Sequence, residues 1–138
     1  MNNGEVIASS KNDFHENDLI PIIISEAIYV HNKLGPGFLE SAYKECLKHR
    51  LIKAGLYVEK EIPIPIVFDE IKLECGYRAD FPINRKIILE IKSVDCLIDK
   101  HVAQTLSYLK FGNFKLGLLI NFNVLRLKDG LRRVVNGL

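Results

Sequence analysis

The sequence of 138 residues lacks the cysteine patterns that mark zinc-binding and disulfide-bonded proteins. Its three cysteines, Cys46, Cys75 and Cys96, are far apart and include no C-x-x-C pair. An odd number of widely spaced cysteines argues against both a zinc knuckle and a disulfide framework. We therefore expect buried, free thiols in a reducing cytoplasm.

Long apolar runs are missing as well. Residues 1–18 have neither the basic start nor the continuous apolar stretch of a secretion signal. The most apolar window, residues 19–30, is interrupted by Pro21 and Glu26, and it is shorter than the roughly 20 residues that span a bilayer. We expect no membrane segment, a flexible N-terminal arm over residues 1–17 and a single domain over residues 18–138.

The sequence also lacks a large excess of charge of either sign. It has 19 Lys and Arg against 17 Asp and Glu, and a net charge of +2 neither requires nor excludes a polyanionic partner. No base-reading motif, zinc finger or Rossmann-type glycine loop is visible. Four basic residues near the C-terminus suit phosphate binding, or equally a solvated sheet edge that discourages strand pairing. They are Arg126, Lys128, Arg132 and Arg133.

The pattern of apolar residues predicts an α/β fold with a central mixed β-sheet flanked by helices. Helical spacing predicts three helices, over residues 18–34, 39–54 and 99–111. Alternation or a continuous apolar run predicts strands over residues 57–68, 71–81, 87–92 and 115–122. Pro63 and Pro65 lack the N–H needed for a ladder, which favours an edge strand there. Asp129 and Gly130 predict the turn of a closing hairpin.

Three charged residues lie in and beside a strand that is otherwise apolar. In the strand over residues 87–92, Glu90 and Lys92 are two apart, so their side chains project from the same face. Asp80 lies opposite Glu90 only if the preceding loop has an odd number of residues, such as residues 84–86. We predict this odd loop, because it gathers two carboxylates and one amine on one patch.

Such a patch suits the hydrolysis of phosphodiesters. Mg²⁺ prefers one or two carboxylates and shares its other positions among waters and phosphate oxygens. The metal lowers the pKa of a bound water, while a nearby ammonium group offsets charge in the transition state. The spacing D-x9-E-x-K is equally typical of an ordinary salt bridge on a half-exposed sheet, so it leaves both interpretations open.

Residues 37–43, "GFLESAY", read G-x-x-E-x-x-Y and resemble the GxxExxY proteins of the PD-(D/E)XK nuclease superfamily. The similarity covers about residues 18–137, including "ADFPINRKIILEIKS", "QTLSYL" and "RLKDGLRRVVNG". The resemblance implies a PD-(D/E)XK nuclease-like fold and cleavage of nucleic acid with Mg²⁺ or Mn²⁺. We expect the substrate to be DNA in preference to RNA.

The resemblance implies roles for individual residues. Asp80 and Glu90 match the metal-binding acids, and Lys92 matches the catalytic lysine. Glu40 resembles an additional acid of related nucleases, which makes it a third metal ligand and catalytic residue. Ala79 stands where the superfamily name has proline, and this departure leaves the acid untouched.

Gln104 and Tyr108 match a Q-x-x-x-Y element of one branch of the superfamily, which implies that they bind substrate. They are four residues apart and share one helix face. Taken alone, Tyr108 could be a core aromatic and Gln104 a solvated residue, while Glu40 could be a first-turn acid favoured by the helix dipole.

The sequence therefore supports two functional hypotheses. The first is a cytoplasmic, metal-dependent nuclease. The second is a nuclease-fold module that is weakly active or inactive and binds nucleic acid or protein as an adaptor, which the short chain favours somewhat. A purely structural network of salt bridges is a third explanation, which the matching motifs disfavour.

Overall fold

The computed structural model describes residues 14–74 and 78–138. Most of the predicted N-terminal arm therefore lies outside the described residues, as does Cys75. The first helix begins at Glu16, two residues earlier than predicted. His15 is its N-cap, because the His15 side chain accepts from the Asn17 N–H while Asp18 accepts from the His15 N–H.

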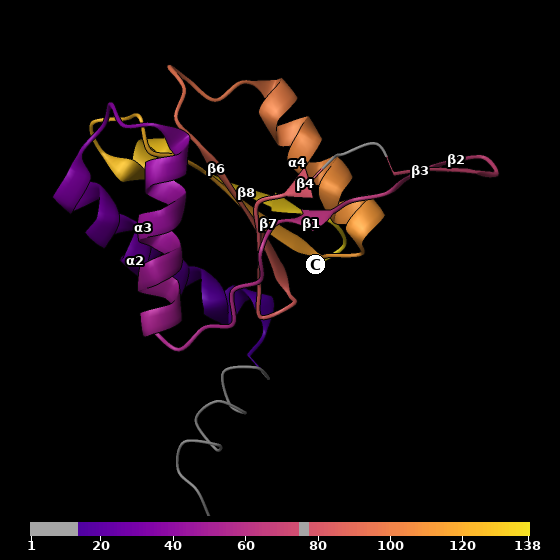
Figure 1. Cartoon of the computed structure of the whole chain (residues 1–138), viewed down its shortest axis with the longest axis horizontal. Helices are drawn as coiled ribbons and strands as arrows, with labels where there is room; N and C mark the ends of the chain where they lie inside the picture. Colours follow the sequence, from indigo (N-terminus) through magenta and orange to yellow (C-terminus); the bar gives the residue numbers. More distant parts are fainter. Residues whose placement is uncertain (1–13, 75–77) are drawn as a thin grey trace, which may run out of the picture.

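Three helices flank a central sheet (Figure 1). They are α2 (Glu16–Leu34), α3 (Glu40–Lys53) and α4 (Asp99–Gly112). Apolar side chains of α2 and α3 share one core cluster with Ile87, Leu89 and Ile91, whereas those of α4 share a second cluster with Ile88. The helices therefore cover opposite faces of the sheet. None of the helices in the described ranges is long and apolar enough to cross a membrane.

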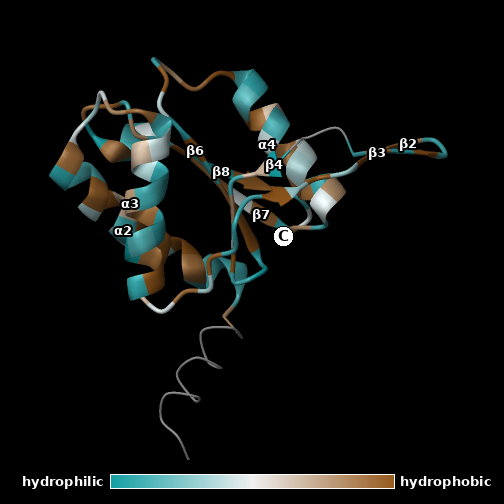
Figure 2. Ribbon diagram, viewed as in Figure 1, coloured by the Kyte–Doolittle hydropathy of each residue, from teal (hydrophilic) through white to brown (hydrophobic). Residues whose placement is uncertain are grey.

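The central sheet is mixed, as predicted. Its strand order is β5-β6-β7-β8, with β6 and β7 parallel and the outer pairs antiparallel. The strands are β5 (Phe81–Ile83), β6 (Ile87–Lys92), β7 (Leu116–Asn121) and β8 (Leu131–Val135). Figure 2 shows that the two central strands, β6 and β7, are predominantly hydrophobic, in keeping with a sheet that is covered on both faces.

The hairpin between β5 and β6 has the predicted odd loop. Phe81 pairs with Leu89 and Ile83 with Ile87, so three residues, 84–86, form the turn. Asn84 has a φ of 50°, and its side chain accepts from the Tyr57 N–H at 2.7 Å. Asparagine tolerates this left-handed conformation better than most residues, which favours the turn at this point.

The stretch before this hairpin differs from the prediction. The long strands predicted over residues 57–68 and 71–81 are replaced by two short antiparallel pairs outside the central sheet. These pairs join β1 (Ile62–Pro63) to β4 (Arg78–Ala79), and β2 (Ile66–Phe68) to β3 (Ile71–Leu73). Prolines at 63 and 65 cannot donate ladder hydrogen bonds, which limits the length of each pair. The β2–β3 ribbon projects from the rest of the molecule (Figure 1).

The prediction of a closing hairpin is also wrong. Residues Leu127–Gly130 form a 3₁₀ helix, η1, that leads directly into β8. Leu127 is buried in the core cluster of α2 and α3, so this segment packs inward instead of forming a strand. The Asp129–Gly130 pair ends η1 and does not form the turn of a hairpin.

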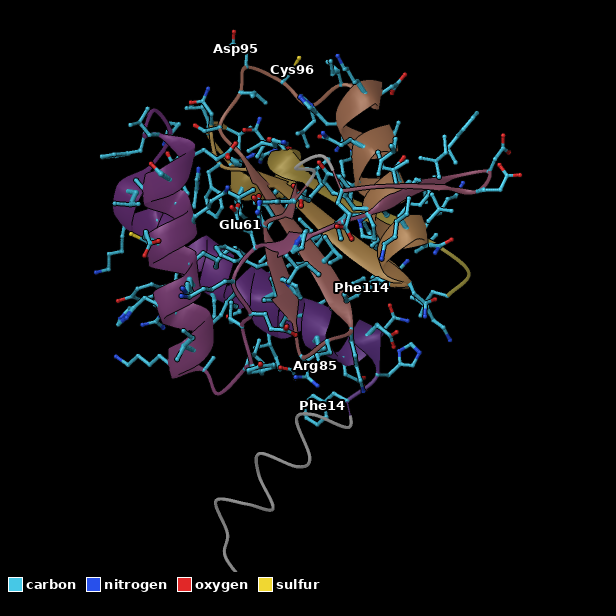
Figure 3. The ribbon with its side chains drawn as sticks, turned by 45° about the vertical axis from the view of Figure 1, so that its right-hand side comes forward. Phe14, Glu61, Arg85, Asp95, Cys96 and Phe114 are labelled. Carbon is cyan, nitrogen blue, oxygen red and sulfur yellow. The ribbon has the colours of Figure 1, made fainter. Side chains whose placement is uncertain are left out.

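The cysteines are more exposed than predicted. Cys96 is an exposed free thiol, and Cys46 is half-buried and free. Figure 3 shows Asp95 and Cys96 at the outer tip of the loop between β6 and α4. The expectation of buried thiols is therefore wrong for Cys96.

Gly130 gives a first testable prediction, because its backbone lies very close to β7. A Cβ atom at this position would lie 2.1 Å from the Asn121 carbonyl oxygen. Gly130→Ala must push apart two backbone segments, so we expect a loss of about 2 kcal/mol in the free energy of unfolding. Urea denaturation checks this value. Lys128→Ala, a change at an exposed neighbour, should stay within about 0.5 kcal/mol of the wild type. An equally small effect of Gly130→Ala would contradict the close approach.

Candidate active site

Asp80 and Glu90 form a buried carboxylate pair at the β5–β6 hairpin. Asp80 lies directly before β5, and the hairpin register places it opposite Glu90. The Asp80 N–H donates to Glu90 Oε1 at 2.9 Å, and the Ile91 N–H donates to Asp80 Oδ2 at 2.9 Å. The two residues are only 7% and 4% exposed. The backbone therefore holds both carboxylates in fixed orientations next to each other.

Two negative charges on this buried pair are electrostatically unfavourable. Burial, followed by repulsion from Asp80, raises the pKa of Glu90 to about 8. The hydrogen bond from the Asp80 backbone and the positive charges of Lys92 and Lys44 oppose this rise without cancelling it. A further positive charge beside Glu90 would therefore stabilise its ionised form.

Lys44, which sequence analysis did not single out, contacts this site from α3. Its Nζ atom lies 2.7 Å from Asp80 Oδ1 and 3.2 Å from Glu40 Oε2. Burial disfavours the charged amine, but the hydrogen bonds and attraction to Asp80 and Glu40 outweigh it and raise the pKa of Lys44. The spacing of four residues between Glu40 and Lys44 indicates from the sequence that these two side chains can pair on the helix. The contact with Asp80 depends on tertiary packing.

The tyrosine of the G-x-x-E-x-x-Y stretch fixes the turn before α3. The Tyr43 hydroxyl donates to the Gly35 carbonyl at 2.5 Å and accepts from the Phe38 N–H at 3.2 Å. Its ring stacks on Phe122 with centroids 4.6 Å apart. Tyr43 is thus a fully buried anchor that sets where Glu40 begins the helix.

The glycine of the same stretch contributes through its backbone. Gly37 has a φ of 98°, a left-handed conformation that favours glycine, and its N–H donates to Asn123 Oδ1 at 3.1 Å. The next residue, Phe38, accepts from the Ser93 hydroxyl at 2.7 Å. These bonds tie the turn before α3 to Asn123, which follows β7, and to Ser93, the residue after Lys92.

A buried asparagine fixes the segment that follows Lys92. Asn121, at the end of β7, donates to the Val94 carbonyl at 2.9 Å and accepts from the Val94 N–H at 3.0 Å. The Lys92 carbonyl accepts from the Phe122 N–H at 3.0 Å. Lys92 itself is half-buried, and its charge acts on Glu90.

Gln104 and Tyr108 lie on α4. Tyr108 is buried in the cluster that contains Ile88 and Ala79, while Gln104 is exposed. Both line a hollow of about 200 Å³ beside Ile64. Asp80 lines another hollow, of about 250 Å³, together with lysines of α3 and the following loop: Lys44, Lys48 and Lys60. The structure therefore places Gln104 and Tyr108 in a different hollow from Asp80.

The basic residues near the C-terminus are exposed on η1 and β8 or next to them. Arg133 donates to Asn17 Oδ1 at 2.5 Å, and Arg126 lies 3.6 Å from Asp129. Because β8 is an outer strand of the sheet, these charges match the interpretation of a solvated edge.

The acids of the site differ in how well they suit a divalent cation. Across residues 14–74 and 78–138, no three His, Cys, Asp or Glu side chains are grouped closely enough to hold one metal ion. Asp80 and Glu90 nevertheless supply the two carboxylates that Mg²⁺ commonly takes from a protein. Burial first and repulsion from Asp80 second raise the pKa of Glu90, and a bound cation would oppose both effects. Asp80 and Glu90 thus fit the ion. Glu40 instead contacts the Lys44 ammonium group, which also contacts Asp80.

A mixed sheet between helices, with a carboxylate pair at one hairpin, defines an α/β fold of the nuclease-like type. A family model described as the PD-(D/E)XK nuclease superfamily matches residues 17–134. The chain belongs to this superfamily, which confirms the resemblance at that level. No curated protein and no solved structure matches the chain. Membership indicates nuclease chemistry in general, with nucleic acid as the substrate class, and divalent metals are typical of the superfamily.

Proposed function

We propose that this protein is a cytoplasmic, Mg²⁺- or Mn²⁺-dependent nuclease of the GxxExxY type that hydrolyses phosphodiester bonds, in DNA in preference to RNA. The observation that carries the proposal is the buried pair of Asp80 and Glu90, whose carboxylates each accept a backbone hydrogen bond of 2.9 Å. Burying two adjacent carboxylates is costly unless a cation or a proton compensates them. A divalent cation is the compensating charge that also supplies chemistry.

Asp80 and Glu90 would hold the metal, with Glu40 as a further acid at the start of α3. When bound, the metal supplies a Lewis acid and a water of lowered pKa. The Lys92 ammonium group projects from the same strand face as Glu90, where it can orient a water or offset negative charge that develops on the phosphate. Gln104 and Tyr108 are proposed substrate contacts on the helix that covers this face.

The hollow beside Asp80 supports a nucleic-acid substrate. Lys44, Lys48 and Lys60 bring three amines to a space of about 250 Å³ beside Asp80, which Glu45 and Glu61 also line. Amines contact phosphates without reading base sequence. This arrangement favours cleavage with little sequence preference.

A nucleic-acid or protein adaptor is the second candidate. One observation favours it, namely that the Lys44 ammonium already pairs with Asp80 at 2.7 Å. A permanent internal pair would leave less need for a metal. The two candidates differ in whether a divalent ion binds at Asp80.

Metal titration and cleavage assays test the proposal together. We expect Mn²⁺ at 100 times its dissociation constant to stabilise the wild type by about 2.7 kcal/mol in urea unfolding. The wild type should then cleave linear, circular or single-stranded DNA, and RNA less, with no cleavage in EDTA.

Asp80→Asn should lose both the stabilisation and the cleavage, because the neutral amide is a poorer ligand for a hard cation. The matched control, Asp95→Asn, changes an exposed acid on the loop after β6 and should behave as the wild type. Binding of nucleic acid with no metal effect and no cleavage would instead support the adaptor.

A further inference from the structure

The Lys44 ammonium group lies between two acids that belong to different parts of the chain. Glu40 is one helical turn before it, and Asp80 belongs to the β5–β6 hairpin. The side chain of Lys44 is 23% exposed, and that of Asp80 is 9% exposed. Water therefore screens this ion pair less than a pair on the open surface, and its strength is correspondingly greater.

The two oxygens of Asp80 have different kinds of partner. Oδ2 accepts from the Ile91 N–H, which is fixed by β6. Oδ1 contacts Lys44 Nζ, which is at the end of a flexible side chain. A cation that binds Asp80 through Oδ1 displaces Lys44, which is the partner that can move away.

From this contact we infer that Lys44 is a tethered cation that competes with the divalent metal for Asp80 and so sets the affinity of the acidic site. The inference rests on the proposed nuclease function. It gives Lys44 a role in metal binding, which that proposal assigned only to the acids. In the metal-free protein, the ammonium group supplies the positive charge that the metal supplies later.

The displaced ammonium group has a place to go. Lys44 lines the hollow that also contains Lys48 and Lys60. Glu45 and Glu61 line it too, so an amine released from Asp80 makes the balance of charge there more positive and strengthens the attraction for a phosphate of the nucleic-acid backbone. Metal binding therefore transfers one positive charge from the acids to the substrate side of the site, which couples the binding of metal and substrate.

Lys48 provides a matched control for this inference. It lies on α3 one turn after Lys44 and lines the same hollow. The ion pairs of the described residues link Lys44, and not Lys48, to Asp80. Removing Lys48 changes the local charge by the same amount without freeing an oxygen of Asp80.

Isothermal titration of Mn²⁺ and of Ca²⁺ measures the competition directly. We expect Lys44→Met to bind either ion at least about fivefold more tightly than the wild type, the lower end of typical coupling between two ligands. Lys44→Arg retains a cation at Asp80 and should restore affinity to near the wild-type value. Lys48→Met should change affinity less than about twofold, since salt screens its charge.

Urea unfolding supplies a second readout, with Lys44→Gln as a second neutral variant. Without metal, both neutral variants should be less stable than the wild type, yet Mn²⁺ should stabilise them more. A merely structural lysine would lower stability by the same amount with and without metal.

The failures of the two proposals are distinguishable. Equal Mn²⁺ affinity in the wild type and Lys44→Met, with binding lost in Asp80→Asn, would overturn the competition and leave the nuclease proposal intact. Weaker binding by Lys44→Met would also overturn it. If neither the wild type nor the neutral variants bind Mn²⁺ or Ca²⁺, both proposals fail together.

Discussion

Replacing Lys92 by alanine is expected to reduce cleavage by about 100-fold or more, the usual effect of removing an electrostatic group from a transition state. Lys92 ends β6 on the same face as Glu90, so its amine reaches the acidic site from the strand itself. Asp80 and Glu90 remain in place in Lys92→Ala. Mn²⁺ affinity and nucleic-acid affinity should therefore change little, while the rate of bond hydrolysis falls.

Single-turnover cleavage at saturating Mn²⁺ separates the rate from binding. Lys110→Ala, at an exposed position on α4, is the matched control and should cleave as fast as the wild type. Undiminished cleavage by Lys92→Ala would remove the lysine from the chemistry. A loss of Mn²⁺ binding or of folding in that variant would show that its role is structural.

The second large effect is a pH dependence of stability that comes from Glu90. Its pKa is about 8 in the folded protein, against an ordinary value of 4.5. Between these values the folded protein holds a proton that the unfolded chain releases. The contribution of Glu90 to stability is therefore fully present below pH 4.5 and is lost as the pH rises through 8. We expect the wild type in EDTA to lose about 3 kcal/mol from this group between pH 5 and pH 8.5.

Glu90→Gln keeps an oxygen for the Asp80 N–H and carries no charge at either pH. We expect this variant to be more stable than the wild type at pH 8.5, with the difference shrinking as the pH falls to 5. Urea denaturation across this range measures both curves, and subtraction removes the contribution of other titrating groups. Glu61 is exposed and lines the hollow beside Asp80, so the stability curve of Glu61→Gln against pH should be parallel to that of the wild type. A Glu90→Gln curve parallel to the wild type would contradict the raised pKa.

The geometry of the acidic pair could be predicted because it depends on local rules. Side chains alternate along β6, and a loop of three residues places Asp80 opposite Glu90. Both facts can be obtained from consecutive residues. The mixed sheet and its covering helices also follow from periodicity, and the family match confirms the fold class.

The errors arose where distant backbone decided the outcome. The Asp129–Gly130 pair has the composition of a hairpin turn, yet η1 forms there and Gly130 packs against the Asn121 carbonyl. Likewise, alternation over residues 57–81 suggested long strands, but Pro63 and Pro65 interrupt the ladder and the central sheet pairs elsewhere. Local pattern gives the period of a strand, whereas tertiary contacts choose its partner.

Lys44 was missed for a related reason. Along α3 it is an ordinary charged residue on a helix with acids nearby, and its spacing from Glu40 indicates only a surface pair. Its contact with Asp80 joins a helix to a hairpin that comes much later in the chain. Tyr43 was recognised as part of a motif, but its function as an anchor became clear only from its bonds to Gly35 and Phe38.

The closeness of Asp80 and Glu90 in the sequence has a consequence for how the protein folds. The two residues are ten apart and meet through a three-residue turn, so closing this loop costs little entropy. The acids can therefore meet while the hairpin is still in water, where their repulsion is weak. The Lys44 ammonium group comes to Asp80 from α3, a separate element, so docking of α3 on the hairpin delivers a compensating charge to the acids.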